Sequence, residues 1–223
     1  MRESDVDALV RGVWAAATGE ASWVAALDPV AAHFGARMAV VQRFDLANQR
    51  VLAIESGGAP DLEDGVLQYL RRFHLQDRRK TSLLEGRLVP HGGWYHDHEH
   101  LDEQFVASDP FYQHFLPAYG CRFVSGRTHA PAPDQACLFA LELPPDRGPL
   151  NADERAELDR LGSHLDDALR TYERLRRARA QVLAGHQLLH TFAQPMWLVD
   201  TDRVVHDANA AAGVVIFQNT GFL

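Results

Sequence analysis

The longest regular pattern of apolar positions lies in the last third of the chain. Between Leu158 and Leu189 the seam positions are spaced alternately three and four residues apart, which is the heptad repeat of a helix that packs along a seam. Only Arg179 and His186 interrupt it with polar side chains. The pattern predicts a connector helix within 150–193 that pairs two copies of the chain. The side chains expected in this dimer seam are Leu158, Leu161, Leu165, Tyr172, Leu175 and Val182.

The start of this helix carries a clear signal. Asn151 and Glu154 have the spacing of a capping box, in which each side chain bonds the other residue's backbone N–H. Acidic residues crowd the first turns and arginines come later, an order that the helix dipole favours. Gly162 and Gly185 each weaken a helix by about 1 kcal/mol relative to alanine. We therefore expect a break near Gly185.

The first two thirds of the chain alternate between helical and extended patterns. Helical periodicity covers 4–18, 22–34, 61–72 and 102–119, and strand-forming residues cover 38–45, 50–56, 121–130 and 135–143. Residues 76–100 are less regular and glycine-rich, as is typical of a binding or lid loop. A small antiparallel sheet flanked by helices and followed by a long helix is an α+β fold.

Composition indicates where in the cell the protein is expected, but it does not indicate the function. The chain has 223 residues and a formal charge of −8, so its overall electrostatics does not favour nucleic acid. No apolar run approaches the roughly 20 residues that cross a membrane, and the N-terminus lacks the pattern of a secretion signal. Its two cysteines are too few for a disulfide framework. We expect a cytoplasmic protein without membrane contact.

Several short motifs occur in the order found in one group of regulators. These are WAAAT at 14–18 with FGA at 34–36, SDPFY at 108–112, LGSHLDDAL at 161–169, and WLVD at 197–200 followed by NAAA at 209–212. Together they resemble the N-terminal region of bacterial LuxR-type helix-turn-helix transcription regulators, whose sensor is related to PAS and GAF domains.

The resemblance implies a fold, a domain order and a function. It predicts a PAS/GAF-like sensor domain over 1–149, a connector and dimerisation helix over 150–193, and an incomplete second PAS-like unit over 194–223. The implied protein is a homodimer that responds to a signal or a small-molecule ligand. It would reach DNA only through a helix-turn-helix domain that this sequence does not show.

Three histidines form the most distinctive local pattern. His96, His98 and His100 alternate with acidic residues, and on a strand they would share one face. Three imidazoles bind Zn²⁺, Ni²⁺ or Cu²⁺. The alternative is a solvated polar loop, because a His-x-His-x-His pattern alone is loose.

Aromatic residues between 94 and 123 allow a pocket for a small apolar ligand. Trp94, Tyr112 and Phe123 are the candidates to line it, although most of these aromatic residues are expected in the core. Cys121 and Cys137 fall on successive expected strands, where they form either a redox-sensitive pair or two buried thiols.

Motifs of catalysis are missing from the sequence. There is no nucleophile elbow, phosphate-binding loop, zinc-protease motif or dinucleotide fingerprint. We therefore expect a non-catalytic sensor module, and the sequence names no cofactor. The alternative is a stand-alone protein that binds a small ligand or a metal and acts through protein–protein contacts.

Overall fold

The computed structural model describes residues 3–48, 50–59, 63–87, 89–132 and 134–219. The chain divides into two compact units, Met1–Tyr172 and Glu173–Leu223, and each is described by itself. The division falls inside helix α8 (Ala152–Thr191). The first turns of this helix therefore belong to the first unit.

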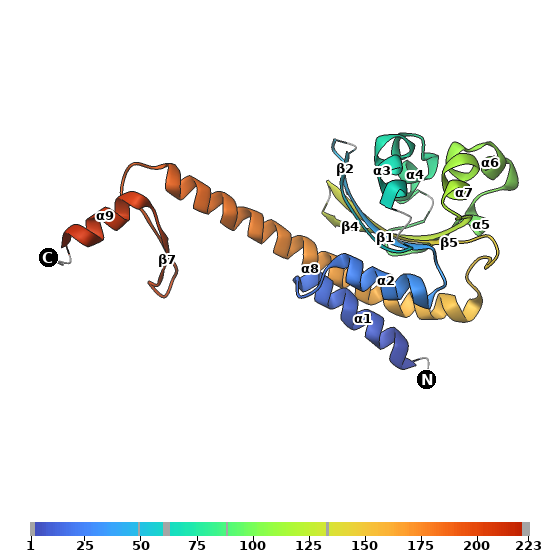
Figure 1. The fold of residues 1–223 in the computed structure, drawn as a ribbon, viewed down its shortest axis with the longest axis horizontal. Helices are drawn as coiled ribbons and strands as arrows, with labels where there is room; N and C mark the ends of the chain where they lie inside the picture. Colours follow the sequence, from blue (N-terminus) through green and yellow to red (C-terminus); the bar gives the residue numbers. More distant parts are fainter. Residues whose placement is uncertain (1–2, 49, 60–62, 88, 133, 220–223) are drawn as a thin grey trace. The chain divides into compact units, whose positions relative to one another are not determined.

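A five-stranded antiparallel sheet forms the centre of the first unit. Its strand order is β2-β1-β5-β4-β3, and consecutive pairs run antiparallel. The strands are β1 (Met38–Asp45), β2 (Arg50–Gly58), β3 (Trp94–His96), β4 (Phe123–Ala132) and β5 (Gln135–Leu143). Both faces of the sheet are covered by helices (Figure 1).

One face of the sheet packs against α1 (Glu3–Thr18), α2 (Trp23–His33) and the start of α8 (Figure 1). Because side chains alternate along a strand, Ala39 and Val41 of β1 point into this core. The leucines at the start of the heptad pattern are buried in the same core, with Leu158 and Leu161 completely enclosed. Burial of a leucine side chain contributes about 2 kcal/mol, so this face fixes α8 to the sheet.

Shorter helices cover the opposite face. They are α3 (Glu63–Arg71), η2 (Phe73–Leu75), α4 (Arg78–Leu84), α6 (Glu103–Ser108), η3 (Phe111–Phe115) and α7 (Leu116–Ala118). Met38 and Val40, the alternate residues of β1, pack here against Phe111 and Phe115. The single-turn helix α5 (Asp97–His100) follows the edge strand β3 directly.

Helix starts follow the sequence signals closely. Asn151 N–H lies 2.8 Å from Glu154 Oε2, and Glu154 N–H donates to Asn151 Oδ1 at 3.0 Å, so the predicted capping box is confirmed. Ser22 caps α2 by accepting the N–H of Ala25 at 3.2 Å. The predicted α+β sheet with flanking helices and a long helix after it is also confirmed.

Two segments differ from the sequence expectation. The helix expected over 102–119 is divided into α6, η3 and α7, because Pro110 follows the end of α6 and Asp109 Oδ1 accepts the N–H of Phe111. The expected loop over 76–100 contains α4, β3 and α5. A three-residue edge strand has no periodicity of its own, which is why β3 escaped detection.

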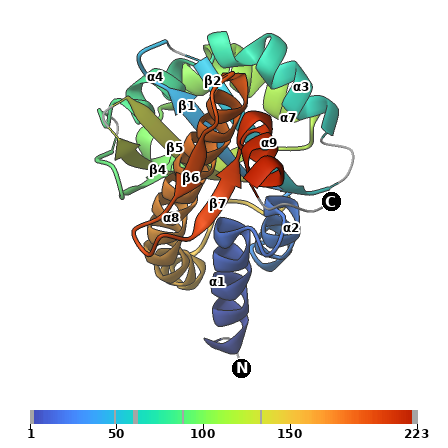
Figure 2. The ribbon, with the colours of Figure 1, turned by 90° about the vertical axis from the view of Figure 1, so that its left-hand side faces the viewer.

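The second unit consists of the last turns of α8, the hairpin β6 (Trp197–Val199) and β7 (Val205–Ala208), and α9 (Ala210–Asn219) (Figure 2). The expected break at Gly185 is wrong, since α8 continues to Thr191. Asn209 holds the unit together: its Nδ2 donates to the carbonyls of Phe192 and Gln194, and its Oδ1 accepts the N–H of Met196.

Within the described ranges, no helix has the length and apolar character needed to cross a bilayer.

Candidate functional site

Two adjoining cavities lie between the sheet and the short helices. They enclose about 240 and 420 Å³ of space between atoms, part of it open to solvent. Their shared lining residues are Val40, Gln42, Tyr69 and Glu142, so we treat them as one site, called the sheet cavity below. The space inside them that a water-sized sphere can occupy is about 10 and 20 Å³, which is room for about one water in each.

The floor of the sheet cavity is formed by the alternate residues of three strands. Gln42 comes from β1 and Glu142 from β5, with apolar side chains between them. In the register of the sheet, Ala140 of β5 lies between Val40 of β1 and Gly126 of β4. Small side chains in the middle of the floor therefore leave the space that the cavity occupies.

The roof of the sheet cavity carries polar groups from α3 and α4. Tyr69 Oη donates to Asp77 Oδ2 at 3.2 Å, and Lys80 N–H donates to Asp77 Oδ1 at 3.3 Å. The ammonium of Lys80 donates to the carbonyl of His74 at 2.5 Å. Burial lowers the pKa of Lys80, and the nearby Asp77 carboxylate partly opposes this. Charged groups are thus held at the edge of an otherwise apolar space.

Gln42 is the unusual residue of this lining. It is 7% exposed, and its amide oxygen accepts no hydrogen bond from any described residue. A buried acceptor without a donor costs about 1–3 kcal/mol, and most such groups in folded proteins are satisfied. An unsatisfied acceptor in the wall of a cavity marks a point where a ligand gains a hydrogen bond.

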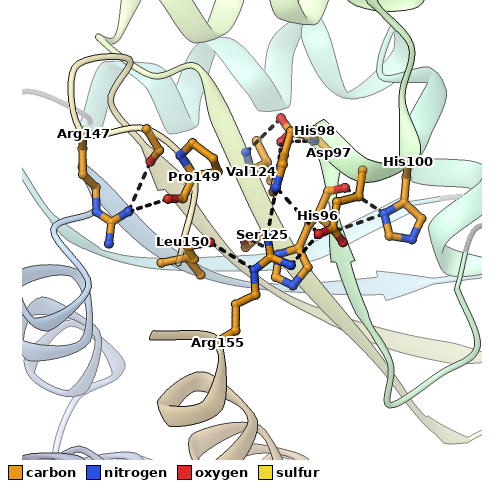
Figure 3. A network of polar contacts seen from close by, with 12 residues as sticks. His96, Asp97, His98, His100, Val124, Ser125, Arg147, Pro149, Leu150 and Arg155 are labelled. Atoms are coloured by element: carbon orange, nitrogen blue, oxygen red, sulfur yellow. Dashed lines mark hydrogen bonds and ion pairs between the residues drawn. The ribbon is translucent and has the colours of Figure 1, made fainter. Parts of the chain in front are cut away.

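A second polar network ties β3 and α5 to the start of α8 (Figure 3). Arg155 donates from Nε to the carbonyl of Leu150 at 3.0 Å, pairs through Nη1 with Glu99, and places Nη2 3.0 Å from His98 Nε2. The buried carboxylate of Asp97 accepts the N–H of Val124 at 2.9 Å and that of His98 at 2.7 Å. These contacts fix the edge of the sheet to the first helical turns.

His96 is the buried member of this network. Its Nδ1 lies 2.9 Å from Ser125 Oγ, and its carbonyl accepts a bond from His100 Nδ1 at 2.7 Å (Figure 3). Burial lowers the pKa of His96 to about 4, and the positive charge of Arg155 adds to the effect. The imidazole is therefore neutral at neutral pH.

The geometry expected for a metal site is wrong. Only His96 lies on a strand, while His98 and His100 belong to the helical turn α5, so the three imidazoles do not share a face. No group of three His, Cys, Asp or Glu side chains among the residues with described positions is arranged to hold a metal ion. We do not propose a metal here.

The aromatic residues expected in one pocket lie on two faces of the sheet. Trp94 and Phe123 pack against the core that contains α8, whereas Tyr112 belongs to the core on the other side. Grouping them in one pocket is therefore wrong, and other residues line the sheet cavity. Cys121 and Cys137 are likewise buried on opposite faces and form no disulfide, so the redox pair is also wrong.

Part of the predicted dimer seam is buried inside the first unit. Leu158, Leu161 and Leu165 are buried in its core, and the ring of Tyr172 packs edge-on against Trp23 at 5.4 Å. Leu175 is half-buried and Val182 is 57% exposed. Pairing of two copies stays a prediction, and the side chains open to it come after Tyr172.

The sequence did not predict four residues of the sheet cavity: Gln42, Asp77, Lys80 and Glu142. One signal was present: in 38–45 (MAVVQRFD), Gln42 continues the alternate positions of Met38 and Val40, which predicts a polar group on a covered face. Asp77 and Lys80 gave no such signal, since they lie in a segment without periodicity.

No protein-family model matches this sequence, and no curated protein matches it. Solved structures do resemble it. The N-acylhomoserine lactone-dependent LuxR-family transcription factor CepR2 from Burkholderia cenocepacia has 16% identity and a TM-score of 0.53, over 78% of this chain and 98% of that one. The VqsR LBD domain from Pseudomonas aeruginosa has 13% identity and a TM-score of 0.49, over 77% and 93%.

SdiA from Escherichia coli is also similar, with 13% identity and a TM-score of 0.48, over 66% of this chain and 58% of that one. This chain therefore spans a little over half of SdiA. At such identities the likeness concerns the fold. The chain has the fold of the LuxR-family factor CepR2, in agreement with the resemblance that its sequence motifs indicate.

Proposed function

We propose that the first unit is the ligand-binding sensor domain of a LuxR-type transcription regulator. The observation that carries the proposal is the sheet cavity, in which the buried Gln42 oxygen has no donor among the described residues. The fold supports it, since CepR2 is an N-acylhomoserine lactone-dependent factor. A small molecule enclosed between the sheet and α3–α4 is the signal in this proposal.

Occupancy of the sheet cavity would act on α8 through the sheet. Successive residues of β1 point to opposite faces, so Val40 lines the cavity while Val41 packs in the core that holds α8. On β4, Arg127 forms a bidentate ion pair with Asp166 of α8, with Nη2 2.6 Å from Oδ2. A shift of these strands on binding would move the helix, which is the requirement for a ligand to bias two states.

We propose further that the chain forms a homodimer. Two copies pair through the part of α8 after Tyr172, where Val182 and Leu183 are 57% and 61% exposed. Val182 occupies a position of the heptad seam and Leu183 follows it directly, and exposed apolar side chains lose water contact when two helices pair. In this proposal 150–193 is the connector, 194–223 is part of a second PAS-like unit, and a further domain contacts DNA.

Ligand binding is tested with protein purified from its native host. We expect native mass spectrometry to show a bound small molecule, and denaturation to release it. Ala140→Leu, which fills the cavity floor, should lose that molecule and keep the fold. His164→Leu, a change of similar type on an exposed turn of α8, should retain it. Absence of any released molecule, together with no stabilisation by added N-octanoylhomoserine lactone, contradicts the proposal.

Dimerisation is tested by light scattering across micromolar concentrations. We expect a dimer mass for the native chain and a monomer mass for Val182→Asp combined with Leu183→Asp. Arg177→Asp is the matched control, because it adds the same carboxylate at an exposed position off the seam. A monomer mass for the unchanged chain contradicts the dimer part and leaves the ligand-binding part standing.

A further inference from the structure

Two histidines near the end of α8 face one carboxylate of the hairpin β6–β7, all three within the second unit. His186 and His190 are four residues apart, so they lie on one side of the helix. Asp207 of β7 pairs through Oδ2 with Nδ1 of His186, and the same oxygen lies 3.6 Å from Nε2 of His190. We propose that these side chains form a proton-operated clasp, which holds the hairpin against the last turns of α8 and loosens as the pH rises.

The carboxylate of the clasp keeps its negative charge. Its side chain is 19% exposed, and its Oδ1 accepts the N–H of Ala208 at 2.8 Å. Burial alone would raise the pKa of the Asp207 carboxyl, but the Ala208 N–H, the pairing with His186 and the charges of the two imidazoles hold it below its usual value. Asp207 is therefore an anion over the whole range of about pH 5 to 8 in which imidazoles ordinarily change charge.

The direction of the pH dependence follows from these charges. A neutral imidazole offers the carboxylate at most one N–H, whereas a protonated imidazole offers an N–H and an opposite charge. A hydrogen bond between charged groups is about twice as strong as one between neutral groups. The clasp is therefore tight at about pH 5.5, where an imidazole ordinarily carries the second proton, and weak above about pH 8, where it ordinarily does not.

The other ionisable side chains near the clasp have partners or positions of their own. Between 180 and 219 they are Asp200, Asp202, Arg203 and His206. The sequences of β6 and α9 contain none. Alternation along β7 places His206 on the other face from Asp207, and its Nε2 lies 2.6 Å from Asp200 Oδ2 inside the hairpin. Asp202 and Arg203 are exposed in the same turn. On α8 the nearest preceding charge, Arg179, is about 10 Å along the axis from His186.

The clasp gives a role to one polar interruption of the heptad pattern. His186 occupies a seam position. Leu189, the next seam position, is 8% exposed, and its carbonyl accepts a bond from Asn209 Nδ2 at 3.2 Å. While the hairpin is docked, the seam from His186 onward is thus occupied by the same chain. Release of the hairpin uncovers it, so the length of the free seam depends on pH. This inference is independent of ligand binding by the first unit and of pairing between two copies.

Hydrogen exchange of the full chain, followed by mass spectrometry between about pH 5.5 and pH 8.5, tests the clasp. Each rate is divided by that of the unfolded chain at the same pH, which gives the protection of the backbone amides. We expect protection of 197–208 to be about three- to tenfold higher at the acidic end, as one or two partly exposed ion pairs imply. Amides of β1 and β5 are the internal reference and should gain no protection as the pH falls.

Three variants assign the response. Asp207→Asn keeps an acceptor and removes the charge, so protection of the hairpin should no longer depend on pH. His186→Gln combined with His190→Gln should have the same effect, and these side chains are 40% and 52% exposed, so the change leaves α8 intact. His206→Gln is the matched control and should keep the native pH dependence, because its partner Asp200 lies within the hairpin.

Three results would overturn the clasp. The first is hairpin protection that stays the same, or falls, between alkaline and acidic pH in the native chain. The second is a pH dependence that survives in the double histidine variant, which decides the matter even if Asp207→Asn loses the hairpin at every pH. The third is loss of the pH dependence in His206→Gln, since the response would then belong to the turn and not to the docking of the hairpin on α8.

Discussion

Gly162 of helix α8 lies directly against the indole of Trp94 on the edge strand β3. A Cβ atom at position 162 would sit 2.9 Å from Cζ2 of Trp94 and 3.3 Å from Nη1 of Arg127. Carbon atoms in contact are normally about 3.5–4.0 Å apart. The glycine therefore permits the close approach of the helix to the sheet, at the expense of helix propensity.

Gly162→Ala should lower the free energy of unfolding by about 1–3 kcal/mol, because overpacking outweighs the roughly 1 kcal/mol that alanine gains in a helix. Gly185→Ala is the matched control, since nothing lies within 4 Å of the added Cβ. It should stabilise its helix by up to about 1 kcal/mol. Urea unfolding followed by circular dichroism measures both; stabilisation of equal size in the two variants contradicts the close approach.

Arg127 and Asp166 should be energetically coupled. Their side chains are 13% and 17% exposed, and the guanidinium also lies over the ring of Trp94 at 5.5 Å. Arg127→Met or Asp166→Asn alone should cost about 1–3 kcal/mol, because the remaining partner is left half-desolvated. The double variant should cost less than the sum.

The same double-mutant cycle on the exposed pair Arg170 and Asp167 provides the reference. These side chains are 46% and 61% exposed and lie 3.3 Å apart. Their coupling should stay below about 0.5 kcal/mol, as for other exposed helix pairs. Equal coupling in the two cycles would show that the pair between β4 and α8 has no special role.

The titration of His96 should lower the free energy of unfolding as the pH falls. Burial and Arg155 hold its folded-state pKa at about 4, whereas the unfolded value is about 6.5. Above pH 7 the imidazole is neutral in both states and contributes no pH dependence. Between pH 6.5 and 4 the unfolded chain binds the proton and the folded chain does not, so the free energy of unfolding decreases.

His96→Gln removes this titration. We expect the loss of stability between pH 7 and pH 5 to be smaller by about 1–2 kcal/mol in the variant than in the native chain. The exposed His114 provides the control, and His114→Gln should leave the pH profile unchanged. Unfolding in urea at a series of pH values measures this. Parallel profiles for all three proteins contradict the assignment.

Asn209 should govern the order of the second unit. It is 2% exposed, and its amide bonds backbone groups of Phe192, Gln194, Met196 and Ala212. Asn209→Ala leaves these buried groups without partners, at about 1–3 kcal/mol for each that water does not reach. Backbone amides of 196–212 should then exchange hydrogen at least tenfold faster, while those of β1 and β5 keep their rates. Asn48→Ala, in an exposed turn, is the control.

Local signals in the sequence predicted the elements that carry their own pattern. Strand β1 has the predicted bounds, 38–45, because its strand-forming residues stand between a helix-ending glycine and a turn. Asn151 and Glu154 marked the start of α8, since a capping box depends on residues three apart. Edge strand β3 was missed because it depends on pairing with β4, which is distant in the chain. The division of the helix expected over 102–119 was also missed, although the residues that cause it, Asp109 and Pro110, are local.

The sequence by itself determined the α+β class, the bounds of β1, and the long helix with its capped start. Only the tertiary structure decided what that helix does at each position. The heptad leucines at 158, 161 and 165 are buried in the core of the first unit, since a heptad pattern specifies an apolar stripe and not the surface that covers it. In the same way, only packing against Trp94 explains Gly162, and only the cavity explains the buried acceptor of Gln42.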